Sequence, residues 1–431
     1  MRKLLLATTA LFGGVAFAGA AHAMPAQSSP ITLNVGGYVD FVAGFFHEAD
    51  GLTPTDSHAS KDFETEFKIN FDAMGKAANG IQYGANVSLW NGSDVTNQAA
   101  TGSATLTATP YAGAQSSVNI DSAYVWMSGA FGKLMLGDEH GASDLFVYAP
   151  TVGEGQVDGR YMDFVDPTRL ARMQPSGIDN TEHSTKVTYY TPKVGNDMNK
   201  VQLGLSYTPN LYNYGQSAVL YNQNLASLQS QVNSPYQDVV EGDLAYTGNF
   251  HPVNVAVSGQ ILTGDASHAV GTGTLLMLNA PTAWDSGEAQ DFTAWGVGTQ
   301  VGFNGLTFGG SYVDEGRYDT THGQNKAQDI TTLGVKYEFD KVGVAASWLT
   351  GQGYDNMLAN GGGANTLAGT NYTNYVRSFD AEGLGATYTW FPGLTSNIDG
   401  VLFQQKENTF GGTAPDENQG YVLLLSQKMT F

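Results

Sequence analysis

The sequence predicts an all-β protein that folds as a transmembrane antiparallel β-barrel of about 16 strands. Apolar and polar residues alternate along many segments, as they do in strands that have one apolar and one polar face. Short and long connections alternate between these segments, and the strand pattern continues to the last residue, Phe431. A strand with a free edge and an apolar face needs both a partner and apolar surroundings, and a closed barrel in a lipid bilayer supplies both.

Residues 1–23 are expected to form a secretory signal peptide. Arg2 and Lys3 precede an apolar stretch, and Ala21-His22-Ala23 offers a small-x-small cleavage site, which is the pattern of such peptides. The segment is short for a membrane-spanning helix and leads into polar residues. We therefore expect export, with a mature barrel domain over residues 24–431.

The composition excludes several classes of protein. The 431 residues include no cysteine, which excludes disulfide scaffolds and thiolate metal sites. A formal net charge of −21 excludes the basic surface on which nucleic-acid binding depends. No run of about 18 apolar residues follows Ala23, so helical membrane spans are not expected. A membrane location therefore requires a barrel.

Two neighbouring segments show the strand pattern clearly. Residues 63–73 (FETEFKINFDA) place mostly apolar side chains on one face and charged or polar ones on the other, and residues 81–90 alternate in the same way after a short turn. The pattern predicts strands over 31–46, 63–73, 81–90, 117–128, 132–138, 185–192, 200–208, 236–249, 252–262, 291–303, 305–313, 329–339, 341–350, 378–390, 394–406 and 420–431.

The strand faces opposite the apolar ones predict what the barrel encloses. Many residues on these faces are ionisable, and burying so many charges in a dry interior would cost several kcal/mol per ion. A barrel of about 16 strands is wide enough for an aqueous channel. We therefore expect a water-filled lumen lined by Asn34, Tyr38, Asp40, Glu64, Glu66, Lys68, Asn86, Asp121, Lys133, Lys186, Glu241, Asp243, Lys336, Glu338 and Lys428.

The longest predicted connection, residues 139–184, follows the fifth strand and is called the third loop. It carries eight acidic residues against three arginines. A structureless loop of this length is uncommon unless it has a function.

At the third loop the chain resembles the Gram-negative general diffusion porins, in particular the proteobacterial trimeric type. The resemblance is carried by Gly129 to Gly137 (GAFGKLMLG), by the long loop with Asp179-Asn180, and by Thr185 to Pro192 (TKVTYYTP). It implies a homotrimer in the outer membrane, in contact with lipid and lipopolysaccharide, through which small hydrophilic solutes and ions diffuse passively. It also implies that the third loop folds into the lumen and that the terminal Phe431 is an assembly signal.

In that family, acidic residues of the third loop face basic residues on the barrel wall and create a transverse field across the constriction. Carried over by position, the candidates are Asp158, Asp163 and Asp166 on the loop and Lys68, Lys133 and Lys186 on the wall. The lysines face inward by strand parity. The sequence departs from the family pattern because its first four predicted strands contain no arginine, which puts the strength of the field in question.

Other interpretations of the third loop stay open. Its acidic residues could be solvated, or could bind divalent cations that bridge lipopolysaccharide. Arg160, Arg169 and Arg172 could hold the shape of the loop by pairing with its acids, or could contact solutes.

The charge balance predicts selectivity, and the motifs predict no chemistry. Acidic residues outnumber basic ones by 40 to 19, so a negative potential at the mouths predicts a mild cation preference. No Gly-x-Ser-x-Gly elbow occurs, and we expect no enzymatic activity. We expect no cofactor. Asp138-Glu139-His140 lacks the histidine spacing of a zinc helix, and a structural Ca²⁺ is the more plausible metal there.

Two alternatives to a general channel remain. A substrate-specific channel, for carbohydrates for example, would use stacked aromatic side chains along the lumen, and the inward Tyr38 is one candidate. A structural or adhesive surface protein would have a barrel that does not conduct.

Overall fold

The computed structural model of the chain describes residues 31–49, 60–91, 118–165, 178, 181, 183–211, 236–266, 290–318, 328–354, 376–407 and 416–431. The expected signal peptide, residues 1–23, lies outside the described residues, as do Asp166, Arg169 and Arg172 of the third loop.

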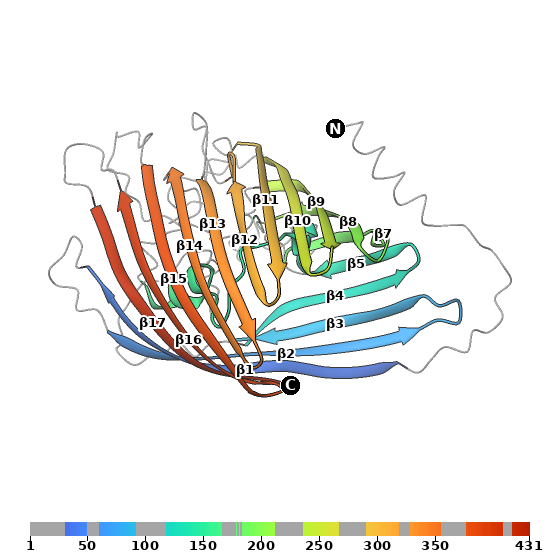
Figure 1. Cartoon of the computed structure of the whole chain (residues 1–431). Helices are drawn as coiled ribbons and strands as arrows, with labels where there is room; N and C mark the ends of the chain where they lie inside the picture. Colours follow the sequence, from blue (N-terminus) through green and yellow to red (C-terminus); the bar gives the residue numbers. More distant parts are fainter. Residues whose placement is uncertain are drawn as a thin grey trace, which may run out of the picture.

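The strands form one closed antiparallel sheet (Figure 1). Their bounds are β1 Thr32–Glu48, β2 Lys61–Lys76, β3 Gln82–Trp90, β4 Asn119–Gly129, β5 Gly132–Asp138, β6 Thr185–Tyr190, β7 Val194–Gly195, β8 Asn199–Asn210, β9 Tyr236–Asn249, β10 Val253–Ala266, β11 Phe292–Phe303, β12 Leu306–Asp314, β13 Gln328–Phe339, β14 Val342–Tyr354, β15 Val376–Phe391, β16 Leu394–Glu407 and β17 Asp416–Thr430. The two-residue β7 pairs with β8, as β6 does, so β6 and β7 share one place in a ring of sixteen. The predicted all-β barrel is confirmed.

The first and last strands close the ring. β1 and β17 pair from Tyr38 opposite Thr430 onward. The backbone N–H of Phe431 donates to the carbonyl of Gly37 at 3.0 Å, and the N–H of Gly37 donates to the carbonyl of Phe431 at 2.9 Å. No strand of the ring is left with a free edge, which is the condition for strands to cross a bilayer.

The two faces of β17 show how side chains are sorted. Leu424 is 1% exposed, whereas its neighbours Leu423 and Leu425 are 36% and 40% exposed. Met429 and Phe431 lie on the exposed face as well. Apolar side chains that point out of a closed ring of strands face the lipid. Successive residues of the strand therefore face the lipid and the interior in turn.

The connections at one end of the ring are short and those at the other end are long, as predicted. Asn304 and Gly305 join β11 to β12 with φ angles of 49° and 83°, the pair of positive φ values that a two-residue hairpin needs. At the opposite end, the third loop joins β5 to β6.

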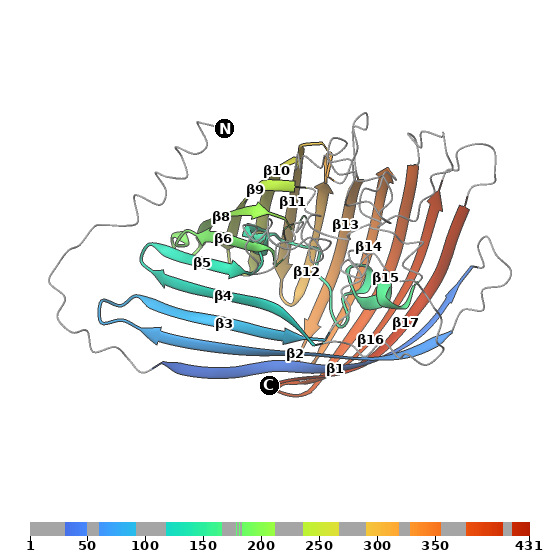
Figure 2. The same ribbon diagram turned by 180° about the vertical axis from the view of Figure 1, so that it is seen from behind.

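The first described stretch of the third loop, residues 139–165, contains three short 3-10 helices: η1 Ala142–Leu145, η2 Gln156–Asp158 and η3 Arg160–Phe164. In Figure 2 the green turns of this segment lie within the ring of strands. Among the residues that the structure describes, no helix is long and apolar enough to cross a bilayer.

Deleting Phe431 should impair assembly of the barrel. The deletion removes both backbone hydrogen bonds to Gly37, each worth about 1 kcal/mol, and a lipid-facing ring. We expect the folded fraction after refolding into liposomes to fall several-fold, measured as heat-modifiable mobility on gels. The substitution Phe431→Leu keeps the backbone hydrogen bonds and an apolar side chain and should fold far better than the deletion. Equal folding of the deletion and the intact chain would contradict this closure.

Candidate functional site

Glycines on the inner wall give the third loop room to lie against the strands. A Cβ atom on Gly298 of β11 would lie 1.8 Å from the carbonyl oxygen of Val147, and one on Gly334 of β13 would lie 2.6 Å from that of Pro150. Hydrogen bonds hold the same stretch, since the N–H of Val147 donates to Ser258 Oγ at 2.7 Å. The loop backbone therefore touches the wall where side chains are absent.

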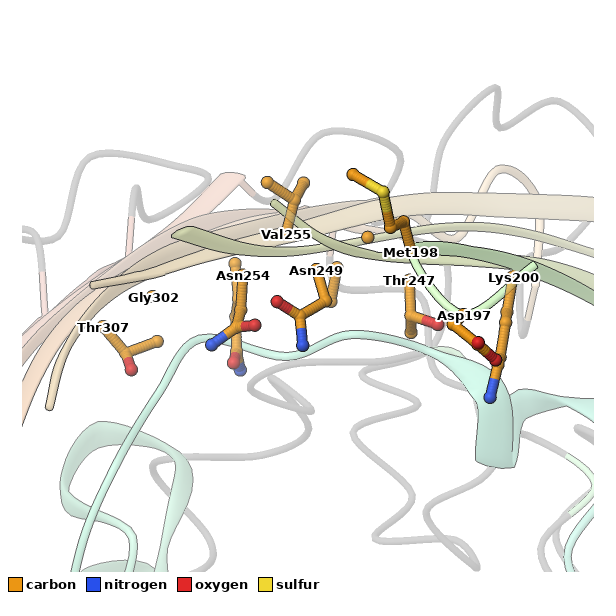
Figure 3. Close-up of a pocket in the computed structure, with 12 residues that line it drawn as sticks. Asp197, Met198, Lys200, Thr247, Asn249, Asn254, Val255, Gly302 and Thr307 are labelled. Atoms are coloured by element: carbon orange, nitrogen blue, oxygen red, sulfur yellow. The ribbon is translucent and has the colours of Figure 1, made fainter. Parts of the chain in front are cut away.

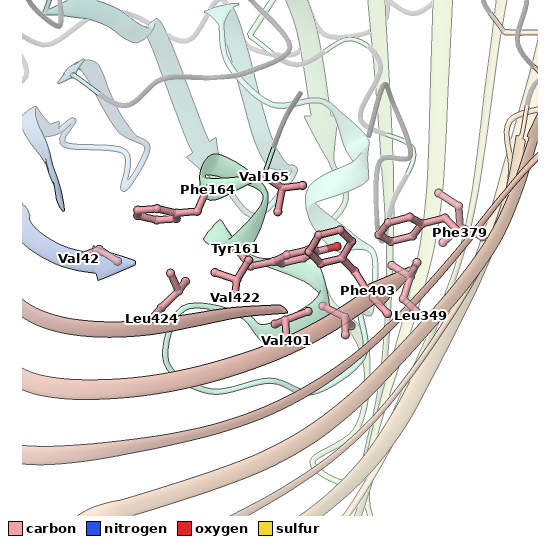
Figure 4. Close-up of a cluster of buried hydrophobic side chains, with 13 residues drawn as sticks. Val42, Tyr161, Phe164, Val165, Leu349, Phe379, Val401, Phe403, Val422 and Leu424 are labelled. Carbon is pink, nitrogen blue, oxygen red and sulfur yellow. The ribbon is translucent and has the colours of Figure 1, made fainter. Parts of the chain in front are cut away.

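The next part of the loop packs on the wall through an apolar cluster, which is called the apolar seat. Tyr161, Phe164 and Val165, with Val157, pack against inward-facing side chains of β1 and of β13 to β17 (Figure 4). The wall side of this cluster consists of Val42, Ile330, Leu349, Phe379, Ala381, Val401, Phe403, Val422 and Leu424. The polar residues named from the sequence are therefore not the whole inner face, because at this cluster the wall is apolar and the loop covers it and excludes water from it.

Polar anchors flank this apolar seat. Glu154 accepts hydrogen bonds from Asn397 Nδ2 at 3.0 Å and from the hydroxyl of Ser426. Its own backbone N–H donates to Asp399 Oδ2 at 2.9 Å, and the side-chain amide of Gln156 also donates to Asp399. These bonds join the loop to β16 and β17.

A second carboxylate holds the two ends of the third loop, near residues 142 and 181, which together are called the root of the loop. Glu241 of β9 accepts hydrogen bonds from the backbone N–H of Ala142 at 2.8 Å and from the hydroxyls of Ser206 and Thr181. Lys186 Nζ donates to Thr181 Oγ1 at 2.9 Å. Both ends of the loop are thus tied to one acidic side chain.

Arg160 of η3 lies in a group of carboxylates, three from the wall and two from the loop. Its guanidinium nitrogens are within ion-pair distance of Glu64 Oε2 (2.8 Å), Glu66 Oε2 (3.5 Å), Asp40 Oδ2 (3.6 Å), Asp163 Oδ2 (3.5 Å) and Glu154 Oε2 (3.9 Å). One further cation, Lys428, lies 3.5 Å from Asp40. The acidic residues outnumber the basic ones, so this acidic cluster has a negative balance when its carboxyl groups are ionised.

The acidic cluster shifts the ionisation of its loop residues. Burial, and then the Glu64 carboxylate, raise the pKa of Asp163 to about 7. Burial acts to lower the pKa of Arg160, but the carboxylates of Glu66 and Glu64 outweigh it and raise that pKa above its usual value. Arg160 therefore stays charged, whereas Asp163 gains its negative charge only as the pH rises through about 7.

The predicted loop-side residues have three different placements. Asp163 lies beside Arg160. Asp158 ends η2 and interacts electrostatically with Tyr161. Asp166 lies outside the described residues.

The predicted wall lysines are not gathered in one place. Lys68 Nζ lies 2.6 Å from Asp121 Oδ2. Lys186 is 3% exposed at the root of the loop. Lys133 sits near the short turn between β4 and β5, 5.8 Å from the ring centre of Trp126.

Sequence reasoning placed Glu241 on the inner face but gave neither Glu241 nor Glu154 a role in holding the loop, and it left the role of Arg160 open between loop acids and solutes. Strand parity placed Glu64 and Glu66 on the inner face, but nothing in the linear order pairs them with an arginine of a distant loop. One signal for the apolar cluster was present in the sequence but was not used: Val422 and Leu424 are apolar at the inward positions of β17, where a wet lumen would favour polar residues.

A separate group of polar residues surrounds Lys68. Asp121, its partner, also accepts a hydrogen bond from Ser88 Oγ at 3.0 Å. A register shift between β3 and β4 at Ser88 and Leu89 leaves Asp121 without a residue directly opposite, and such a bulge can turn two successive side chains to the same face. Nearby, Glu139, His140 and His183 each offer a ligand atom, and these atoms lie within 4.8 Å of one another.

The inner wall of β8 to β12 near the short turns forms a recess of about 410 Å³ (Figure 3). Its lining is mixed, with the polar side chains of Lys200, Thr247, Asn249, Asn254 and Thr307 beside apolar ones such as Met198 and Val255. The described interior therefore combines apolar clusters, where loop residues meet the wall, with polar wall positions such as these.

Comparison with known proteins places this geometry among related folds. The sequence profile of a family described as Gram-negative porin matches residues 7–408. No curated protein matches the chain.

Solved structures share the fold at low sequence identity. OmpF of Salmonella typhi, in complex with daunomycin, is 14% identical with a TM-score of 0.51, over 93% of this chain and 97% of that chain. OmpT, an outer membrane protein of Vibrio cholerae, is 11% identical with a TM-score of 0.50, over 95% of this chain and 100% of that chain. A trimer form of OmpT is 10% identical with a TM-score of 0.50, over 94% and 100%.

The substitution Gly298→Ala should loosen the third loop. The added Cβ would lie 1.8 Å from the carbonyl oxygen of Val147, so the loop must move away and its hydrogen bond to Ser258 must weaken. A loss of about 1.4 kcal/mol in local stability raises cleavage of a transiently opened segment about tenfold. We expect a rise of at least this order in tryptic cleavage after Arg160, measured by mass spectrometry on the folded protein.

Gly302→Ala is the matched control, because Gly302 lies on the same face of the same strand but its nearest neighbour would be 3.6 Å from the new Cβ. It should leave the cleavage rate unchanged. Equal rates for the two variants would show that the loop is not seated at Gly298.

Proposed function

Since the chain belongs to the Gram-negative porin family, we propose that it forms a water-filled channel in the outer membrane for passive diffusion of small hydrophilic solutes and ions. The third loop narrows this channel, and the acidic cluster around Arg160 gives it a mild cation preference. The single observation that carries the proposal is that cluster, in which a loop residue meets wall residues of β1 and β2.

The position of the loop supports a constriction. Its described part is attached to the inner faces of strands on several sides of the ring, from Ser258 of β10 to Ser426 of β17. A segment held in this way reduces the open cross-section, so solutes are selected by size where they pass it.

The charges support cation preference. Five carboxylates against Arg160 and Lys428 leave a negative potential at the narrowed part, and the whole chain carries a net charge of −21. A lumen with an excess of one charge concentrates ions of the opposite sign, most strongly at low ionic strength.

The aromatic side chains favour a general channel over a carbohydrate-specific one. Tyr236, Phe292 and Tyr318 form a cluster of ring contacts, but Tyr236 and Phe292 are 0% and 2% exposed and so present no free face to a passing sugar. The ring of Tyr38 is approached by Lys428 Nζ at 4.2 Å.

Flux of graded uncharged sugars should therefore rise linearly with concentration, whereas saturation would favour the substrate-specific alternative.

We propose in addition that the chain is exported by the signal peptide at residues 1–23 and assembles as a homotrimer among outer-membrane lipid and lipopolysaccharide. One of the similar structures is described as a trimer form, and the exposed apolar outer face of the barrel suits both lipid and a neighbouring subunit.

The channel should be cation-selective in planar bilayers, with the corresponding sign of the reversal potential under a KCl gradient. Replacing Arg160 by Gln should strengthen the preference. A unit charge about 5 Å from a passing ion changes its energy by about 0.8 kcal/mol in water, so the permeability ratio should rise by up to roughly fourfold at low salt.

Arg317→Gln serves as the matched control for Arg160→Gln, because it removes the same charge from an exposed position next to β12. It should change the ratio much less. An anion-selective reversal potential in the unmodified protein would overturn the charge argument, and absence of any conductance would overturn the channel itself.

Cation preference should increase with pH through the ionisation of Asp163. Its pKa of about 7 lies above the usual value, so the carboxyl is neutral below about pH 7 and adds a negative charge above it. The reversal potential should therefore shift towards stronger cation selectivity between about pH 6 and pH 8, and Asp163→Asn should make this step smaller.

Because the imidazole of histidine as a residue type ionises between about pH 5 and pH 8, the reference for Asp163→Asn is Asp158→Asn, which removes a carboxyl from the same loop and keeps every histidine. A pH step of equal size in the two variants would rule out Asp163 as its source.

A further inference from the structure

We propose that Glu139, His140 and His183 bind one divalent transition-metal ion of the Zn²⁺ and Cu²⁺ class at the root of the third loop. The three side chains each offer one ligand atom, and these atoms lie within 4.8 Å of one another. All three residues are partly exposed, so an ion can reach them and their side chains can rotate.

The register of two strands explains why residues so far apart in sequence meet. The ladder between β5 and β6 ends with Asp138 opposite Thr185. Continued by two residues, the same register places His140 opposite His183, and their ring centres are 4.2 Å apart. Glu139 is the residue between the end of β5 and this histidine pair.

Neighbouring groups orient the donors. The hydroxyl of Tyr124 hydrogen-bonds to the Glu139 carboxylate, and the backbone N–H of His140 donates to Glu139 Oε1 at 2.9 Å. His183 Nε2 lies 3.9 Å from Asp121 Oδ2. Contacts of this kind, between a ligand and a second group that holds it, are usual around protein metal sites.

The local charge favours a cation. Asp144 and Lys68 both interact electrostatically with Glu139, and Asp121 pairs with Lys68. Around Glu139 the carboxylates of Asp121, Asp144 and Glu139 itself thus outnumber Lys68, and a divalent ion would neutralise the excess.

The types of ligand atom determine which metal ion the site prefers. Two imidazoles and one carboxylate suit Zn²⁺ or Cu²⁺, whereas Ca²⁺ requires six to eight oxygen ligands. Ligand atoms about 2.0–2.2 Å from a tetrahedral metal are roughly 3.3 Å from one another. A small rotation of the side chains is therefore enough to bring the ligand atoms within binding distance of one ion. Because only three protein ligands are present, the fourth tetrahedral position stays open for water.

A metal at this site would join the two ends of the third loop and place a double positive charge beside Lys68. If the barrel conducts as proposed above, the bound ion should oppose the passage of cations. This consequence rests on the proposed function, whereas the binding site itself does not.

Titration of the purified full chain in detergent with ZnCl₂, followed by calorimetry, tests the site. We expect one strong site per chain, with affinity reduced roughly tenfold or more by His140→Gln, by His183→Gln and by Glu139→Gln. His251→Ala is the control, because this histidine is exposed in the turn between β9 and β10 and should not matter. Absence of a strong site in the unmodified chain would overturn the proposal, as would variants that bind like it.

Electron paramagnetic resonance of Cu²⁺ added to the unmodified chain does not depend on whether the variants fold. Coupling to two nitrogens is expected, and a spectrum with none would overturn the assignment. Displacement of Zn²⁺ by an equal concentration of Ca²⁺ would also overturn it, because an oxygen site would then be present.

Single-channel recording separates this proposal from the proposed function. Zn²⁺ should lower the conductance of the unmodified channel and of His251→Ala, but not that of His183→Gln. A chain that binds Zn²⁺ at these residues but never conducts would contradict the channel and leave the metal site standing. A channel whose conductance ignores Zn²⁺, with no binding in calorimetry, would contradict the metal site alone.

Discussion

The dry contact between the third loop and the inner wall is the constraint on which the rest of the lumen depends. Val157, Tyr161, Phe164 and Val165 are buried against apolar side chains of β1 and β13 to β17. Burial of each such side chain contributes about 1.5–3 kcal/mol relative to exposure, so their combined effect is comparable with the marginal stability of a whole domain. A loop held by this much burial stays against the wall as a fixed part of the barrel interior.

Once the loop is seated, its polar residues have fixed neighbours. The position of Arg160 follows from the apolar contact, because Tyr161 and Phe164 in the same short helix are buried against the wall. The guanidinium then has to lie among the wall carboxylates Glu64 and Glu66. A group of like charges at close range repels itself, and Arg160 together with Lys428 offsets part of this repulsion while leaving a negative balance.

The acidic cluster around Arg160 and the polar group around Lys68 share one strand, β2. Glu64 and Glu66 of β2 contact Arg160, and Lys68, two residues further on the same face, contacts Asp121 beside the histidine pair. The charges of the two groups are therefore linked through one face of β2, where Glu66 and Lys68 are two residues apart.

The sequence by itself determined the barrel, because the direction of a strand side chain alternates locally and needs no distant partner. It also determined that Lys68, Glu64 and Glu66 face inward and that Leu423 and Leu425 face outward. The tertiary structure alone decided that Arg160 meets Glu64, that His140 meets His183, and that Val422 and Leu424 are dry. These contacts join segments far apart in the chain, and they depend on where a long loop comes to rest, which periodicity does not encode.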